Sequence, residues 1–142
     1  MSKPRTKYLT IIEVKHISHA LAKKLMEWDE PIPDFSTRFP NVLEKCLAAP
    51  RQTFRGELYR GLISKAAILF YLLIKNHPFQ NGNKRIAVTT VLVFLLKNGR
   101  WLKVDNQELY NFSRWVAESD PTVKDAVVDA IEKKFGDHLV KM

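Results

Sequence analysis

The sequence predicts an all-α fold, a bundle of helices with one small β-hairpin. Apolar residues recur at the three- and four-residue spacing of a helix along most of the chain. Two segments, 62–75 and 83–97, are apolar on nearly every side, which is typical of helices buried in a core. Only residues 51–61 alternate polar and apolar side chains as a strand does, so one hairpin is the only strand structure expected.

Length and composition indicate a single domain over residues 1–142. Apolar residues make up 46% of the chain and charged residues 27%, which is enough apolar material for a core and excludes a disordered chain. We expect the two ends, residues 1–7 and 136–142, to be flexible.

Cysteine content and apolar run length bear on the compartment. The single cysteine, Cys46, can form neither a disulfide within the chain nor a cysteine-based zinc site, which fits a reducing cytoplasm. The opening residues lack the apolar core of a signal peptide, and no apolar run reaches the roughly 18–20 residues of a membrane span. We therefore expect a cytoplasmic protein with no membrane partner.

The first third of the chain begins with a helix signal. Thr10 and Glu13 have the spacing of a capping box, and apolar residues at helical spacing follow, which predicts a first helix from about 11 to 28. Prolines between 31 and 40 interrupt this pattern and predict a loop. A short amphipathic helix over 42–47 comes next, before the hairpin.

After the hairpin and the two core helices, further cap signals divide the remaining chain. Asn98-Gly99 is a C-cap pair that ends the second core helix. Asp105 begins a helix that continues through Val116, and Asp120-Pro121 begins a last helix through Phe135.

The connection between the two core helices, residues 76–85, holds more polar groups than a connection needs. Gly82 permits close approach of the backbone, and the free N–H groups of a helix that begins at about Asn83 would point at any anion in the loop. Arg85 can bind a phosphate bidentately, while Lys84 acts as a mobile point charge. Together these residues predict a phosphate site.

His77 lies at the other end of the same connection. Histidine readily exchanges a proton near neutral pH, so His77 is the candidate general base. Solvated cations, a structural histidine and a plain Asn-Gly turn would account for the same residues one by one. Their coincidence within ten residues between two buried helices favours a site.

Residues 77–85, HPFQNGNKR, resemble the motif of the Fic/Doc (fido) family, His-x-Phe-x-(Asp/Glu/Asn)-(Gly/Ala)-Asn-(Gly/Lys)-Arg. Other segments are similar to the death-on-curing (Doc) branch of that family, in the same order: YLTIIEV, LAAPRQTFRGELY, KAAILFYLLIKN and VFLLKNG. The resemblance runs from Tyr8 to about Phe135 and is weakest over 29–41. It implies a Fic/Doc-type helical bundle with a β-hairpin flap.

This resemblance implies a toxin-type transferase that moves a phosphoryl group from ATP to a hydroxyl of a target protein. His77 would take the hydroxyl proton, and Asn83 and Arg85 would act with it as catalytic residues that contact phosphate. The nucleotide site would consist of Asn83 and Arg85 together with Gly82 and Lys84.

Three motif positions refine the expectation. Phe79 would anchor the loop in the core. Family members usually carry a magnesium-binding acidic residue where this chain has Asn81, and a neutral amide is a weaker ligand for Mg²⁺. Asn81 is therefore a weak metal contact or simply part of a turn. Lys84 favours phosphoryl transfer, because AMP-transferring relatives generally have glycine there.

By the same resemblance, residues 51–59 correspond to the family's flap. Thr53, Phe54 and Arg55 would pair with an extended target segment by β-augmentation, although a plain surface hairpin explains them equally well. The inhibitory Ser/Thr-x-x-x-Glu-Gly/Asn motif of self-restrained relatives is missing from the sequence. A small antitoxin protein is therefore the implied inhibitor, and a bacterial translation factor such as elongation factor Tu is the implied target.

Three alternatives stay open at this point. The same loop could transfer AMP, and the neutral Asn81 fits a catalytically weak relative that acts through a protein partner. The net charge of +8 fits a nucleic-acid module, but the basic residues are spread along the chain without interleaved aromatic residues.

Overall fold

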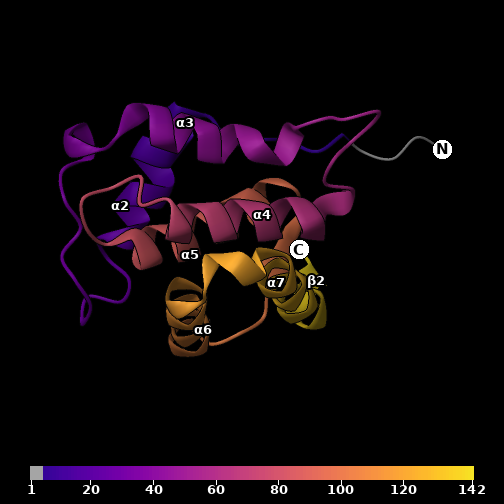
Figure 1. The fold of residues 1–142 in the computed structure, drawn as a ribbon. Coiled ribbons are helices and arrows are strands. Elements are labelled where there is room, and N and C mark those ends of the chain that lie inside the picture. The colour runs from indigo at the N-terminus through magenta and orange to yellow at the C-terminus, as the bar shows by residue number, and fades with distance from the viewer. Residues whose placement is uncertain (1–4) are drawn as a thin grey trace.

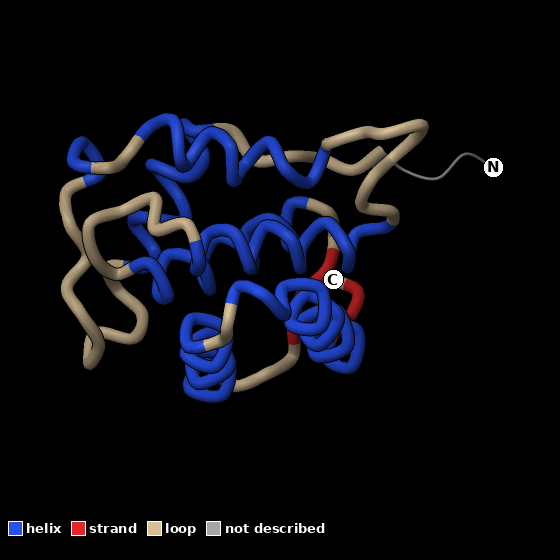
Figure 2. Tube along the Cα trace, in the orientation of Figure 1, coloured by secondary structure: helices blue, strands red, loops and turns tan. Residues whose placement is uncertain are grey.

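The computed structural model describes residues 5–142. Helices α1 (Ile11–Glu13) and α2 (His19–Ala22) are joined by a π-helical turn, Val14–Ser18. The longer helices are α3 (Pro40–Ala48), α4 (Gly61–Lys75), α5 (Asn83–Lys97), α6 (Asn106–Glu118) and α7 (Lys124–His138). Strands β1 (Arg100–Leu102) and β2 (Leu139–Lys141) pair antiparallel, and Figures 1 and 2 show the arrangement.

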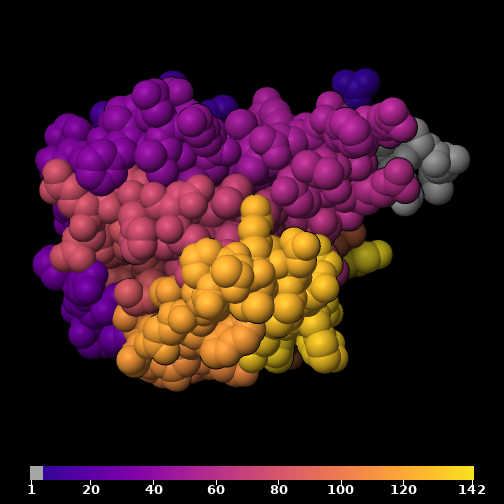
Figure 3. All heavy atoms as spheres, viewed as in Figure 1, coloured from indigo at the N-terminus to yellow at the C-terminus, as the bar shows by residue number. Residues whose placement is uncertain are grey.

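Helices α4 and α5 form the centre of the bundle. They lie side by side, with α3 against α4 on one side and α6 and α7 on the other (Figure 1). Most side chains of both helices are buried, because their apolar residues face neighbours in every direction. Figure 3 shows the N-terminal part of the chain on one side of the central band and the C-terminal helices on the other, and residues 76–82 join the two central helices at one end of the bundle.

The predicted all-α fold class is confirmed, and so are the strongest local signals. The helices expected over 62–75 and 83–97 are α4 and α5 to within one residue. The capping box at Thr10 and Glu13 is formed. Asp105 caps α6 by accepting a hydrogen bond from the backbone N–H of Gln107 at 3.1 Å. These elements follow from sequence because each depends on residues a few positions apart.

The first helix is shorter than the predicted 11–28. It ends after Ala22, and Met26 has a left-handed φ of 56° that a continuing helix excludes. The carbonyl oxygens of Ala22 and Leu25 accept hydrogen bonds from a distant guanidinium, that of Arg85, so this turn is shaped by tertiary contacts.

The strands are not where the alternating pattern placed them. Within the expected hairpin over 51–61, the structure has a single bridge, between Thr53 and Glu57. The two-stranded sheet instead joins β1 to β2, with Trp101 opposite Val140. Residues 136–142, expected to be a flexible end, form the end of α7 and strand β2. Strands of three residues are too short for a period of two to be recognised in a sequence.

The N-terminal expectation covers residues 1–7, of which 1–4 lie outside the described residues. Lys7 exchanges two backbone hydrogen bonds with the side chain of Asn98, at 2.7 and 2.9 Å.

Among the helices of residues 5–142, none has the length and apolar character required to cross a lipid bilayer.

Candidate active site

The connection between α4 and α5 is held in shape by Asn83. Its side-chain oxygen accepts the backbone N–H of Phe79 at 3.0 Å, and its amide donates to the carbonyl of the same residue at 2.8 Å. The amide nitrogen also lies 3.4 Å from Nδ1 of His77. His77 is exposed and has a left-handed φ of 50°, a strained conformation that persists where the surroundings impose it. One buried side chain therefore holds the loop and also reaches the candidate base.

Phe79 anchors this loop in the core. Its ring is buried and lies 5.7 Å from the ring of His19 and 5.9 Å from that of Phe35, measured between centroids. His19 in turn contacts the carbonyl oxygen of Pro33 through Nε2 at 2.9 Å, and burial lowers the pKa of this imidazole. The loop is thus tied to two segments that precede it by more than forty residues.

Gly82 forms the N-cap of α5. It has a left-handed φ of 70°, and a Cβ atom added there would lie 2.7 Å from Cδ1 of Ile32. Both the conformation and the close packing call for glycine. Oε2 of Glu30 lies 3.5 Å from the backbone nitrogen of Gly82, so a carboxylate stands at the positive end of the α5 dipole.

Arg85 is 3% exposed, and its guanidinium is engaged by backbone carbonyl groups. It donates to Leu25 through Nε at 3.1 Å and through Nη2 at 2.8 Å, and also to Ala22 and Glu30. These bonds hold the end of α2 and the following turn against α5. The guanidinium is thus committed to backbone carbonyl groups, and the phosphate contact expected of Arg85 stays a prediction.

Comparison with known proteins agrees with the motif and the fold. The sequence model of the Fic/DOC family matches residues 8–95, more than half of the chain. The chain belongs to the Fic/DOC family. A curated relative, "Toxin Doc" of Mycolicibacterium smegmatis, is 36% identical over 73 residues. The match covers 51% of this chain and spans about half, 56%, of the relative. No solved structure matches the chain.

Lys84 of the Fic/DOC motif borders a cavity of about 520 Å³ between the turn after α2 and helix α6. Asp29 and Glu30 line one side of this cavity, and Tyr110 and Arg114 line the other. Sequence reasoning missed these four residues, because they belong to segments distant from the motif. The acidic residues beside Lys84 would oppose a phosphate there unless they move or are neutralised.

Asn81 is half-buried in the loop. Among residues 5–142, no group of three or more histidine, cysteine, aspartate or glutamate side chains is placed to hold a metal ion. The nearby donor set thus offers a neutral amide and the carboxylate of Glu30, a poor match for Mg²⁺ unless the ion brings ligands of its own.

The expected flap residues, Thr53, Phe54 and Arg55, do not approach His77. Their segment lies at the N-terminal end of α4, whereas the loop with His77 lies at its C-terminal end (Figure 1), and a helix of 15 residues is about 22 Å long. Residues 30–39, which we call the covering segment, lie against the loop instead. The backbone N–H of Phe39 donates to the carbonyl oxygen of Pro78 at 2.9 Å. The proline-rich sequence of the covering segment indicated only an irregular loop.

Proposed function

We propose that this Fic/DOC protein transfers a phosphoryl group from ATP to a hydroxyl of a target protein, with His77 as general base. The observation that supports this best is the loop itself. It combines an exposed imidazole, the N-terminus of α5 and the cation of Lys84 in one rigid connection. Phosphoryl transfer needs mainly these elements, since positioning and charge stabilisation supply most of its catalysis.

In the proposed reaction, His77 accepts the proton of the target hydroxyl. The hydroxyl oxygen then bonds to the γ-phosphorus while the bond to the bridging oxygen breaks, and its electron pair leaves with ADP. Asn83 bears on this step, because a base at Nε2 requires the hydrogen on Nδ1. The Asn83 amide, 3.4 Å from Nδ1, favours the tautomer with the hydrogen on Nε2. The long contact between Asn83 and Nδ1 must therefore be given up before Nε2 can accept a proton.

The first-turn N–H groups of α5 and Lys84 would receive the transferred phosphate. Arg85 would support them from behind, by fixing the start of α5 to the turn after α2. Phosphate would have to displace the carboxylate of Glu30, which an exposed side chain and a 3.5 Å contact allow. Mg²⁺ would enter with the ATP phosphates and neutralise their charge, with Asn81 as one neutral oxygen ligand.

AMP transfer by the same loop is the second candidate. Lys84 favours phosphoryl transfer, since it fills the place where AMP-transferring relatives have glycine. A weakly active protein that acts through a partner is the third candidate, and the carboxylate of Glu30 at the expected phosphate position favours it.

One labelling experiment separates these functions. The protein and its His77→Ala variant are incubated with a bacterial extract and ATP labelled at either the α- or the γ-phosphate. We expect γ-label in a target protein, reduced by a factor of about 10² to 10⁴ in the variant. Transfer of α-label would establish AMP transfer, and equal labelling by the variant would refute the role of His77.

The name of the M. smegmatis relative supports a toxin in this chain. We propose a cytoplasmic toxin restrained by a small antitoxin protein. Expression alone should then arrest bacterial growth, His77→Ala should abolish the arrest, and co-expression of a small protein encoded beside the gene should relieve it. Harmless expression of a folded, ATP-binding protein would contradict the proposal.

A further inference from the structure

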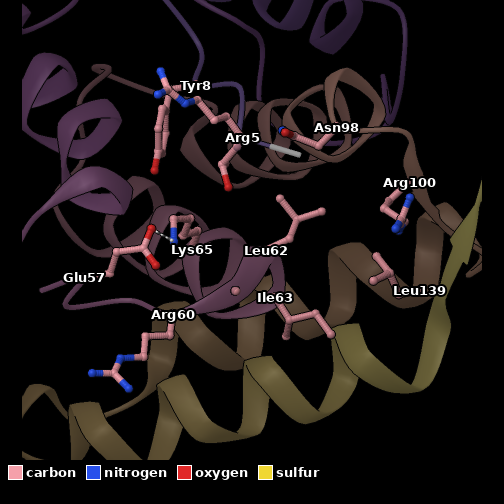
Figure 4. A pocket seen from close by; sticks show the side chains of 12 residues that line it. Arg5, Tyr8, Glu57, Arg60, Leu62, Ile63, Lys65, Asn98, Arg100 and Leu139 are labelled. Carbon is pink, nitrogen blue, oxygen red and sulfur yellow. Dashed lines mark hydrogen bonds and ion pairs between the residues drawn. The ribbon is translucent and has the colours of Figure 1, made fainter. Parts of the chain in front are cut away.

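A cavity of about 1070 Å³ lies at the N-terminal end of α4 (Figure 4). It is one helix length from residues 76–85, which we call the motif loop. Four segments form its walls: residues 5–8, residues 57–65, the end of α5 with β1, and strand β2. We call this cavity the basic groove. It shares no residue with the motif loop, so it calls for an explanation of its own.

The walls of the basic groove are held by defined contacts. Lys65 is 1% exposed, and its ammonium group donates to the carboxylate of Glu57 at 3.2 Å and to the carbonyl oxygen of Tyr59. Asn98 fixes the opposite wall through its two hydrogen bonds with the backbone of Lys7. The segments before α1 and before α4 are thus positioned by contacts within the chain, as in a pre-formed site.

Positive charge is in excess in the basic groove. Arg5, Arg60, Lys65 and Arg100 line it, against the single carboxylate of Glu57. Among the ion pairs of the described chain, only Lys65 of these four has a partner. Helix α4 adds the positive end of its dipole. Its first turn holds no acidic residue and its N-cap makes no side-chain hydrogen bond, so neither offsets this positive end. Such an arrangement is relieved by a bound anion.

Between the cations, the groove is aliphatic. Leu62 projects into its middle (Figure 4), and Ile63 and Leu139 also line it. All three side chains are half-buried, so they present apolar surface to the groove. The arginines stand on different sides of this floor rather than converging on one point (Figure 4).

We propose that the basic groove binds an acidic peptide segment of a partner protein. Aliphatic side chains of that segment would pack on Leu62, Ile63 and Leu139, and its carboxylates would pair with Arg5, Arg60 and Arg100. Charge complementarity selects such a segment, and the separation of the arginines fits carboxylates distributed along a chain. This binding is independent of the transfer proposed for the motif loop.

A nucleic acid fits the groove less well. Proteins that bind single strands offer aromatic faces on which bases stack. The aromatic ring at the groove, Tyr8, has the guanidinium of Arg51 at 4.6 Å from its centroid and the ring of Phe94 at 6.5 Å. A cation therefore lies over this ring already, and the aliphatic floor offers bases no stacking partner.

The test measures fluorescence anisotropy of labelled probes at about 0.15 M salt, where long-range charge effects are screened. The probe is a short peptide repeating Glu-Leu-Glu-Ser. A second peptide has serine for every leucine, and a single-stranded DNA carries the same number of negative charges. Protein variants are Arg60→Gln/Arg100→Gln, in the groove, and Lys15→Gln/Lys45→Gln, two exposed lysines outside it that remove equal charge.

We expect the leucine-containing peptide to bind best, with a dissociation constant that rises about 10-fold in the groove variant and less than 2-fold in the control variant. Melting temperatures must match, which shows that both variants are folded. Equal weakening by both pairs would reduce the effect to net charge and overturn the proposal. DNA binding as tightly, or a serine peptide binding equally well, would also overturn it.

Discussion

Replacing Arg85 by lysine tests whether this residue supports the motif loop or binds phosphate. Its guanidinium makes four contacts to three backbone carbonyl groups, those of Ala22, Leu25 and Glu30. Lysine keeps the charge but has a compact head that does not match this planar fork. At least one buried carbonyl group then loses its donor.

The expected loss of stability follows from these contacts. A hydrogen bond to a charged group contributes about 1.5–3 kcal/mol, so Arg85→Lys should lower the free energy of unfolding by about 2–4 kcal/mol. For a chain of 142 residues, the entropy of unfolding is about 0.3 kcal/mol per degree. The melting temperature should fall by roughly 7–13 °C.

Thermal unfolding followed by circular dichroism measures this change, and calorimetry at a temperature where the variant is folded measures ATP affinity. We expect less than a threefold change in affinity, because the guanidinium faces the protein interior. Lys84→Met is the matched control and should show the reverse, a weaker ATP complex with a nearly unchanged melting temperature. Unchanged stability of Arg85→Lys with ATP affinity reduced more than 10-fold would refute the supporting role.

Three further changes test other contacts. Glu30→Gln should strengthen ATP binding by about 2- to 5-fold in calorimetry, because phosphate no longer competes with a carboxylate at the α5 N-terminus; weaker binding would contradict this. Gly82→Ala should lower the free energy of unfolding in urea by about 1–2 kcal/mol, since φ is 70° and Ile32 lies in the way; an unchanged midpoint would argue against that strain. The hydrogen bond from Lys97 holds the pKa of Glu13 below its usual value, so its contribution to stability is present above about pH 4.5 and is lost as pH falls through the lowered pKa. The stability difference between the protein and Lys97→Met should therefore shrink on acidification, and a constant difference would exclude this linkage.

Sequence reasoning succeeded where the determining residues are neighbours. Helices α4 and α5 were predictable because their apolar residues leave no polar face. Helix α6 was predictable because Asp105 caps it through the backbone N–H of Gln107, two residues away. The motif at 77–85 was recognisable as a compact loop for the same reason. In the structure His77 is exposed and Gly82 has a positive φ, while the chemistry assigned to them stays a prediction.

The features that the sequence could not reveal have a common physical origin in contacts distant along the chain. The partners of Arg85 lie 55 to 63 residues before it, and no local pattern reveals them. The same contacts end the first helix before Trp28, which packs edge-on against Tyr110 at 4.6 Å instead of continuing a helix face. The flap residues were placed by resemblance, whereas the direction of α4 carries them away from His77.

The dependence of the loop on residues 19–39 means that the nine-residue motif is not a self-sufficient unit. A gene truncated to begin after residue 40 would still encode HPFQNGNKR, but it would lack Ala22, Leu25 and Glu30, which hold Arg85, and His19, which packs on Phe79. A genome scan for the motif would count such a remnant as intact. Counting intact copies of this family in genomes therefore requires the N-terminal forty residues as well as the motif.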